Sequence, residues 1–303
     1  MPSGIHDIKK RIKSIKNTRQ VTKAMEAVSA SKMRKATEQA VTTRQYSSLG
    51  WQLIQNLSLV TDESQHPLLK AAVAPQKILL IFITSDKGLC GGLNSQVIRQ
   101  MDRYLQEHPV PQIDIISIGK KGQYVLKKLR RNIVGAYEGL TDQPSIIALR
   151  PIAQTALAGF QSGQYDQVQI IFTDFKSALT QQPVIRQLLP LQKEALENIV
   201  GADKDNQVDL QPTTSQPTEY IFEPNPKELL DAVLPRLLEV QIYQAVLESA
   251  ASEHSARMLA MRNATDSANE MIKDLTLTFN QARQASITQE IAEIAAGRAA
   301  LEN

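Results

Sequence analysis

The distribution of proline is the feature that most constrains this chain of 303 residues. After Pro2 the next proline is Pro67, and after Pro235 there is none before the last residue, Asn303. Proline removes a helical hydrogen bond and clashes with the preceding turn, so each of these stretches can hold one unbroken helix of ~60 residues. Such a helix spans about 90 Å, whereas a compact domain of this size is only ~40 Å across. We therefore predict that both ends of the chain are long helices that project from a globular body.

Apolar residues in both stretches recur at the spacing of helices that pair, three and four residues apart. Several members are small or polar, which favours two helices of one chain that pack closely as an antiparallel coiled coil, with their outer faces covered by a partner. The expected N-terminal seam comprises Ile5, Ile8, Ile12 and Ile15, and then drifts through Val21, Met25 and Val28. The expected C-terminal seam comprises Met261, Thr265, Ala268, Ile272, Leu275, Phe279, Ala282 and Ser286, and Ile287, Ile291 and Ile294 open a second register.

Between the two helices the pattern changes to alternating strands and helices. Such an alternation predicts a Rossmann-like α/β domain with a mostly parallel sheet covered on both faces. The overall fold class is thus α/β, with long N- and C-terminal helices around a central domain. Strands are expected at residues 77–84, 113–119, 133–137, 168–174 and 219–223, with an extended stretch at 184–191. Helices are expected at residues 94–107, 120–131 and 146–160. These elements divide the chain into an N-terminal helix at 1–66, an α/β domain at 67–223 and a C-terminal helix at 224–303.

The segment SDKGLCGGLN at residues 85–94 lies where phosphate-binding loops occur, after a strand and before a helix. It matches neither G-x-G-x-x-G nor a P-loop, so a turn that reverses the chain is the favoured interpretation. The single cysteine, Cys90, has no histidine in a catalytic context to activate it, and the four histidines lack metal-ligand spacing. We therefore expect no catalytic residue, no cofactor and no metal.

Charge is unevenly distributed along the chain. Residues 1–35 hold ten Lys and Arg against Asp7 and Glu26, whereas the whole chain has a net charge of +3. A basic end on an otherwise acidic chain indicates a partner with a negative surface. The lysines share one helix face, so a solvated face and a face that meets acidic protein both remain open. A nucleic-acid-binding arm is less favoured, because residues 1–45 contain no aromatic side chain for base stacking.

Three segments resemble those of gamma subunits of F-type ATP synthases. They are IKKRIKSIKNTRQVTKAMEAVSASKMRKA at residues 8–36, SDKGLCGGLN at 85–94, and ASEHSARMLAMRNATDSANEMIKDLTLTFNQARQASITQEIAE at 251–293. The resemblance extends over essentially the whole chain and is weakest at residues 190–217. It implies a coiled-coil shaft inside a hexamer of alpha and beta subunits, in a 3:3:1 ratio with this chain. It also implies an α/β domain without a nucleotide site, and a shaft foot on the membrane c-subunit ring that binds epsilon.

The resemblance also assigns partner contacts by motif position. Met25, Arg283, Gln284 and Thr288 match positions that contact the beta subunits. The region that faces the c ring and epsilon is matched by Tyr220, Phe222 and Glu223 and, more loosely, by Arg44 and Tyr46. The chain would have no active site of its own, because the family places ATP chemistry in the beta subunits.

The function implied is that of the central rotor shaft, which couples ion flow through the c ring to ATP synthesis or hydrolysis. Two alternatives are a coiled-coil protein with a basic nucleic-acid-binding arm and a Rossmann-like enzyme with helical extensions. No apolar run approaches the ~20 residues of a membrane span. The N-terminus has no secretory signal and does not favour a transit peptide. The chain is therefore expected to be peripheral on the cytoplasmic side of a bacterial plasma membrane, without a thiol switch because Cys90 stands alone.

Overall fold

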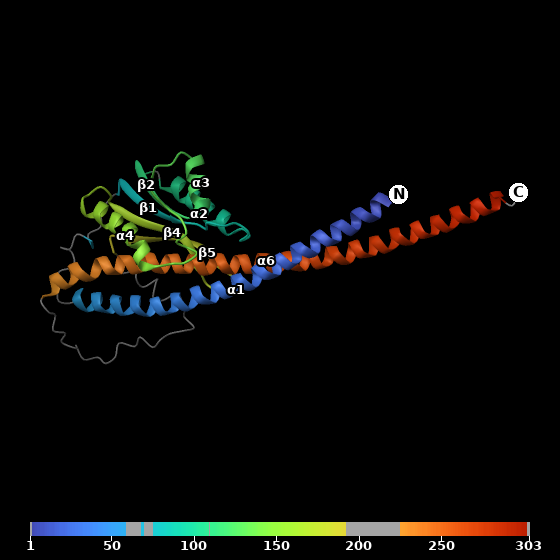
Figure 1. The fold of residues 1–303 in the computed structure, drawn as a ribbon. Coiled ribbons are helices and arrows are strands. Elements are labelled where there is room, and N and C mark those ends of the chain that lie inside the picture. Colours follow the sequence, from blue (N-terminus) through green and yellow to red (C-terminus); the bar gives the residue numbers. More distant parts are fainter. Residues whose placement is uncertain (1, 59–67, 70–74, 109, 192–224, 302–303) are drawn as a thin grey trace. The chain divides into compact units, whose positions relative to one another are not determined.

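The structure is a computed structural model that describes residues 2–58, 68–69, 75–108, 110–191 and 225–301 (Figure 1). The chain divides into two compact units. One is formed by Met1–Ala30 together with Arg257–Asn303, and the other by Ser31–Ala256. The expected division near residues 66 and 223 stays a prediction, because both boundaries fall outside the described residues.

Two long helices carry the ends of the chain, as the proline-free stretches predict. Helix α1 spans Pro2–Ser58 and α6 spans Pro226–Leu301, which is 57 and 76 residues. Helix α6 starts before the proline-free stretch and runs across Pro235. Leu234 and Leu237 beside that proline are buried. Their burial, at about 1.5–3 kcal/mol each, offsets the ~3 kcal/mol that a proline inside a helix costs.

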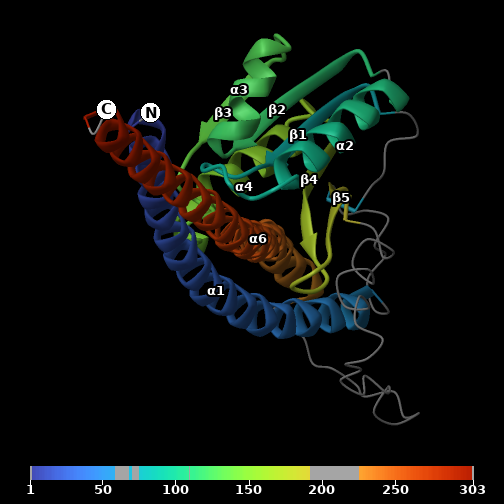
Figure 2. The same ribbon diagram turned by 90° about the vertical axis from the view of Figure 1, so that its right-hand side faces the viewer.

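The second unit is built on a sheet of five strands in the order β3-β2-β1-β4-β5. The first four pair in parallel and β5 is antiparallel to β4, which confirms the expected mostly parallel sheet. Figure 2 shows β3 and β5 at opposite edges. The strands are β1 (Lys77–Ile83), β2 (Gln112–Ile118), β3 (Ile133–Tyr137), β4 (Gln167–Phe175) and β5 (Gln181–Leu189). All lie within three residues of the expected ranges, and the strand expected at 219–223 lies outside the described residues.

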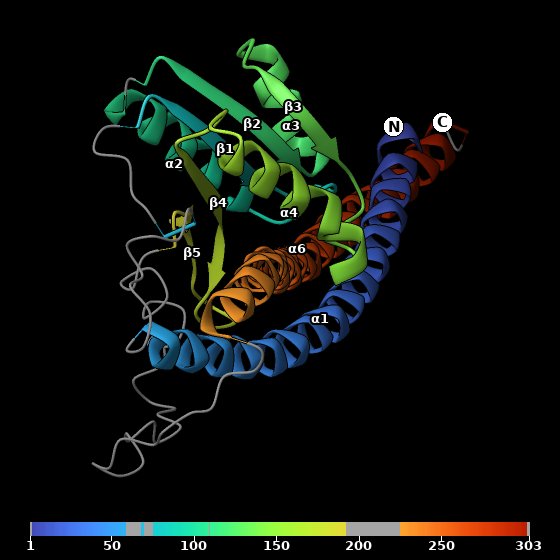
Figure 3. The same cartoon turned by 90° about the vertical axis from the view of Figure 1, so that its left-hand side faces the viewer.

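Helices cover both faces of this sheet. Helices α2 (Leu93–Glu107) and α3 (Lys120–Lys128) pack on the face that presents Leu80, Phe82 and Ile115. The opposite face presents Leu79, Ile81 and Phe172 to α4 (Ile146–Gln161) and to the first part of α6 (Figure 3). Helix α6 therefore supplies one of the layers of the α/β fold as well as continuing into the other unit.

Helix α3 ends at Lys128, three residues before its expected end. The chain turns at Arg130, which has a left-handed backbone with φ of 52°. The N–H of Arg130 donates to the carbonyl of Lys127 at 3.1 Å, and the N–H of Arg131 donates to the carbonyl of Leu126 at 3.0 Å. These two bonds form the Schellman motif, which ends a helix by satisfying its last carbonyls. Glycine usually occupies the left-handed position after a helix. Because arginine stands at that position here, the sequence did not reveal this helix end.

Gly122 permits α3 to pack closely on β1. A Cβ at this position would lie 2.7 Å from Cε1 of Phe82 and 2.8 Å from Oγ1 of Thr84. The N–H of Gly122 donates to the same Thr84 oxygen at 2.8 Å. The close approach that permits this hydrogen bond therefore depends on the absence of a Cβ at Gly122.

We expect Gly122→Ala to lower the free energy of unfolding by about 1–3 kcal/mol, the usual cost of overpacking a core. Urea titration of the full chain, followed by far-ultraviolet circular dichroism, measures the change. Gly4→Ala is the matched control, because nothing lies within 4 Å of its added Cβ and alanine favours a helix. Equal stability of the two variants would contradict the close packing of α3.

Candidate coupling surfaces

In the first unit the two helices pair antiparallel. The hydroxyls of Thr22 and Thr265 hydrogen-bond at 2.8 Å, and Nη1 of Arg19 donates to Oδ1 of Asn269 at 3.2 Å. The partner on α6 moves towards the C-terminus as the residue on α1 moves towards the N-terminus. The expected antiparallel pairing is thus confirmed within this unit.

The seam of α1 keeps a strict seven-residue step, which differs from the predicted drift. Thr22 and Ser29 are buried, whereas Val21 and Val28 are 58% and 57% exposed. The prediction of Val21 and Val28 in the seam was therefore wrong. A strict heptad from Ile8 through Ile15 leads to Thr22 and Ser29, so the step persists while the side chains change from isoleucine to small hydroxyl residues. Helix pairs with small residues at the contact approach closely at modest apolar burial.

The seam of α6 agrees with its predicted register. Met261, Thr265 and Ala268 are buried, and the later members of the seam are half-buried as far as Ser286. The predicted second register is exposed, with Ile291 at 62% and Ile294 at 73%. These isoleucines therefore have no covering helix within the described part of their own unit.

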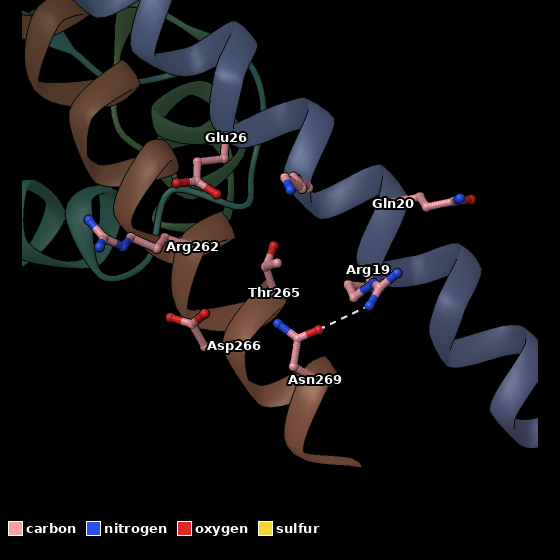
Figure 4. Close-up of a pocket in the computed structure, with 8 residues that line it drawn as sticks. Arg19, Gln20, Glu26, Arg262, Thr265, Asp266 and Asn269 are labelled. Carbon is pink, nitrogen blue, oxygen red and sulfur yellow. Dashed lines mark hydrogen bonds between the residues drawn. The ribbon is translucent and has the colours of Figure 1, made fainter. Parts of the chain in front are cut away.

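A polar groove of about 510 Å³ lies between the two helices (Figure 4). Arg19 and Asn269 bridge it, and Figure 4 shows Gln20 directed away from α6. Charges of both signs line the groove, an arrangement that suits contact with polar protein surface. The lining residues are Arg19, Gln20, Lys23, Glu26, Arg262, Thr265, Asp266 and Asn269.

The residues assigned to partner contacts are only partly visible. Met25 is half-buried next to the seam, and Arg283, Gln284 and Thr288 are exposed on α6. Arg44 and Tyr46 lie on α1, in a part whose side chains the structure does not describe. Tyr220, Phe222 and Glu223 lie outside the described residues. All nine assignments stay predictions.

The glycine-rich loop at residues 85–94 closes on itself. The N–H of Ser85 donates to Oδ1 of Asn94 at 3.1 Å, and Nδ2 of Asn94 donates to Oγ of Ser85 at 2.7 Å. The Ser85 hydroxyl donates in turn to the carbonyl of Lys87 at 2.7 Å. Cys90 is buried against the same asparagine, whose Nδ2 lies 3.3 Å from its Sγ. The side chains of Ser85 and Asn94 therefore stabilise the turn of the loop itself, as a chain reversal requires.

Both long helices contact the carboxyl end of β4, at the sheet edge where ligands bind in open α/β folds. Phe175 at the end of β4 packs against Ala36 of α1 and against Ala250 and Ala251 of α6. The hydroxyl of Ser252 donates to the carbonyl of Thr173 at 3.2 Å. Side chains of α1 and α6 thus cover the carboxyl end of β4.

Asp142 ties the glycine-rich loop to α1. It forms ion pairs with Lys32 of α1 and, at 3.2 Å, with Lys87 of the loop. The hydrogen bond from Lys32, opposed by partial burial and supported by Lys87, lowers the pKa of Asp142 to about 2. This cluster ties α1 to the loops that follow β1 and β3 within one unit.

Sequence reasoning missed a second ionic cluster, between the sheet and α6. Asp174 at the end of β4 is buried and lies 2.8 Å from Nζ of Lys176 and 3.5 Å from Nη2 of Arg186. Burial raises the pKa of Asp174, but Lys176, Arg186 and Glu248 outweigh it and hold that pKa below its usual range. Arg186 also lies 3.6 Å from Oε2 of Glu248 on α6 and 4.9 Å from the centre of the Phe172 ring. An aspartate that ends an apolar strand was the available signal, but Arg186 and Glu248 come from other elements and could not be assigned to it from the sequence.

Within the described residues, no group of His, Cys, Asp or Glu side chains is arranged to hold a metal ion. The helices of the described ranges also include none that is long and apolar enough to cross a membrane.

Comparison with known proteins decides the family. The family model described as ATP synthase matches residues 4–301. The ATP synthase gamma chain of Chloroflexus aurantiacus is 42% identical over 305 residues, which cover 99% of each chain. That of Herpetosiphon aurantiacus is 43% identical over 308 residues, and that of Legionella pneumophila is 39% identical over 302. The chain belongs to the ATP synthase gamma chain family.

Solved structures agree with this membership. A central-stalk and c-ring structure of the Tetrahymena thermophila mitochondrial ATP synthase contains a chain that is 27% identical, with a TM-score of 0.59. The match covers 80% of this chain and 99% of that one. A Euglena gracilis mitochondrial ATP synthase shares the fold with a TM-score of 0.65 at 20% identity, over 99% of this chain and 95% of its own. Membership of the gamma chain family makes the function that of a central rotor shaft.

We expect Thr22→Val and Thr265→Val each to lower the free energy of unfolding of this gamma chain by about 1 kcal/mol. The double variant should lose less free energy of unfolding than the two single variants lose together, because either single change already breaks the hydrogen bond between the hydroxyls. Urea titration of the full chain measures the cycle. Thr18→Val and Thr276→Val are the control pair, since each is exposed and bonds only its own helix. Additive effects at Thr22 and Thr265 would contradict a hydrogen bond across the seam.

Because folding lowers the pKa of Asp142, the stability of the chain should fall as the pH becomes acidic. The folded pKa of about 2 lies below the unfolded value of about 4. The ion pairs therefore stabilise the fold fully above pH ~4 and lose their effect as the pH falls towards ~2. Asp142→Asn should lower the urea midpoint at neutral pH, and its difference from the native chain should shrink over that acid range. A constant difference from pH ~7 to ~2 would show that the ion pairs contribute nothing.

Proposed function

We propose that the chain is the rotating shaft through which ion flow in a membrane c-subunit ring drives ATP synthesis or hydrolysis at catalytic beta subunits. Its relatives are gamma chains of ATP synthase, and one similar structure is that of a central stalk with its c ring. In this proposal the chain assembles with alpha and beta subunits in a 3:3:1 ratio and with epsilon. It lies peripherally on the cytoplasmic side of a bacterial plasma membrane.

The observation that carries this proposal is the continuity of α6. Its first half is buried against the sheet through Leu230, Leu238 and Ile242. Its second half pairs with α1 in the other unit through Thr265 and Asn269. One helix of 76 residues therefore belongs to both units, so a turning force on the α/β unit can pass to the helical pair without crossing a loop.

The proposal assigns no active site to this chain. At the carboxyl edge of the sheet, Phe175 packs against α1 and α6, and Asp142 forms ion pairs with Lys32 and Lys87. The glycine-rich loop uses Ser85 and Asn94 for its own hydrogen bonds. Both observations favour a mechanical role over that of a Rossmann-like enzyme. The purified chain alone is expected to hydrolyse no ATP.

We further propose that Met25, Arg283, Gln284 and Thr288 contact the beta subunits. The exposure of the last three suits such a contact. Arg44, Tyr46, Tyr220, Phe222 and Glu223 are proposed to face the c ring and epsilon.

Affinity purification of the tagged chain from detergent-solubilised membranes tests the assembly. Recovery of two larger subunits in a 3:3:1 ratio with the chain, together with ATPase activity, would support the shaft. Recovery of the chain alone, as a soluble monomer or dimer, would overturn it.

We expect Ile272→Pro to abolish ion-driven ATP synthesis. A proline inside α6 removes a hydrogen bond and kinks the helix at a cost of ~3 kcal/mol, so the shaft no longer transmits a turn. Proton- or sodium-driven synthesis in inverted membrane vesicles measures the effect. Ile272→Ala keeps the helix and should retain most of the activity. Full synthesis with proline at this position would argue against a rigid α6 shaft.

A further inference from the structure

The outer face of α3 carries four lysines around one exposed tyrosine. Tyr124 is 72% exposed at the middle of the helix. Side chains three and four residues apart are neighbours on a helix, and the neighbours of Tyr124 at these spacings are all lysine: Lys120, Lys121, Lys127 and Lys128. The opposite face of α3 is buried through Gly122 and Leu126.

The turn after α3 extends this basic face with two arginines. Arg130 occupies the left-handed position of the Schellman motif, with φ of 52°, where glycine is the usual residue. A left-handed backbone costs a residue with a side chain about 1–2 kcal/mol. Arginine therefore stands at a position where glycine would avoid backbone strain. Strained residues cluster at functional sites.

The charge of this face is largely unbalanced within the chain. No acidic residue occurs between Asp114 and Glu138. Among the described residues, Lys120 pairs with Glu138 at 3.1 Å, and no other basic residue of the face has a recorded ion pair. We call this surface the basic α3 face; it consists of Lys120, Lys121, Tyr124, Lys127, Lys128, Arg130 and Arg131.

Next to the basic α3 face lies the free edge of the sheet. Strand β3 is the outermost strand and pairs only with β2 among the described strands. Figures 2 and 3 both show α3 beside β3. Val134 of this strand is partly exposed. An unpaired edge offers backbone N–H and C=O groups to an added polypeptide strand.

We propose that the basic α3 face and the adjoining β3 edge form a docking surface for an acidic polypeptide segment of another subunit. This inference rests on the proposed assembly of the chain into an ATP synthase. Carboxylates of the segment pair with the lysines and with Arg130, and the ring of Tyr124 packs against the stems of the acidic side chains. Backbone groups of the segment pair with β3.

A polypeptide fits this surface better than a lipid or a nucleic acid. The apolar face of α3 is already buried against the sheet, so it cannot insert into a bilayer as an interfacial helix does. Single-stranded nucleic acids need several aromatic platforms, and Tyr124 is the one aromatic side chain of the face. The free β3 edge offers backbone pairing that only a polypeptide can complete.

Photocrosslinking in the intact purified complex tests the docking. Tyr124 is replaced by p-benzoylphenylalanine, and Ile147, which is 71% exposed on α4, receives the same replacement as the control. We expect an adduct at position 124 with an Asp- and Glu-rich segment of another subunit. Salt should lower the yield of this adduct, because the screening length between charges falls to ~3 Å at 1 M ionic strength. An adduct with phospholipid or nucleic acid, or none beyond the control, would overturn the docking. Failure to recover the complex would overturn the proposed function and the docking together.

Arg130→Gly in the crosslinking background separates docking from structural strain. Glycine relieves the left-handed backbone, so the urea midpoint should stay equal or rise. Loss of the guanidinium should lower the adduct yield about tenfold, the effect of one charge-assisted hydrogen bond. Lys127→Gln with Lys128→Gln should also lower the yield. The control variant, Arg99→Gln with Arg103→Gln on α2, also removes two positive charges and should leave the adduct yield unchanged. A raised midpoint with an unchanged yield would show that Arg130 only ends the helix.

Discussion

The packing of α6 against the sheet is the interaction on which the rest of the structure depends. A parallel sheet has two apolar faces, and both need a helical layer. Helices α2 and α3 cover one face, but α4 covers only part of the other, and Leu230, Leu234, Leu237 and Ile242 of α6 complete it. The same helix continues beyond the sheet and pairs with α1. The core of the α/β unit and the helical pair thus share one covalent element.

The helical pair is held by contacts of a different kind. Its seam passes from isoleucine to Thr22 and Ser29 on α1 and meets Thr265 and Ala268 on α6. Small residues bring the helices close, and the Thr22–Thr265 hydrogen bond satisfies polar groups that the close approach buries. Such a seam stabilises the pair less than a leucine seam would. A partner that surrounds the pair, as proposed here, would supply further burial for exposed isoleucines such as Ile291.

The α/β unit has the topology of a ligand-binding fold, but its binding edge serves another purpose. Phe175, Asp142 and Ser252 join the carboxyl ends of the strands to α1 and α6. The buried Asp174 and the half-buried Arg186 reinforce the junction with α6. A ligand-binding topology therefore does not by itself indicate a ligand or a reaction, because function is decided by the residues of the site and not by the fold.

Local patterns in the sequence were sufficient to predict the two long helices, the positions of the strands to within three residues, and the family, because proline positions, apolar runs and long motifs are all local. It did not reveal the true seam of α1, since Val21 and Val28 are more apolar than Thr22 and Ser29 and only the heptad geometry selects among them. The end of α3 was concealed because Arg130 occupies a position that favours glycine. The packing of α6 on the sheet and the ion pair between Asp142 and Lys32 became known from the folded chain alone. Those contacts join residues that are distant in sequence, and local patterns carry no information about which distant elements meet.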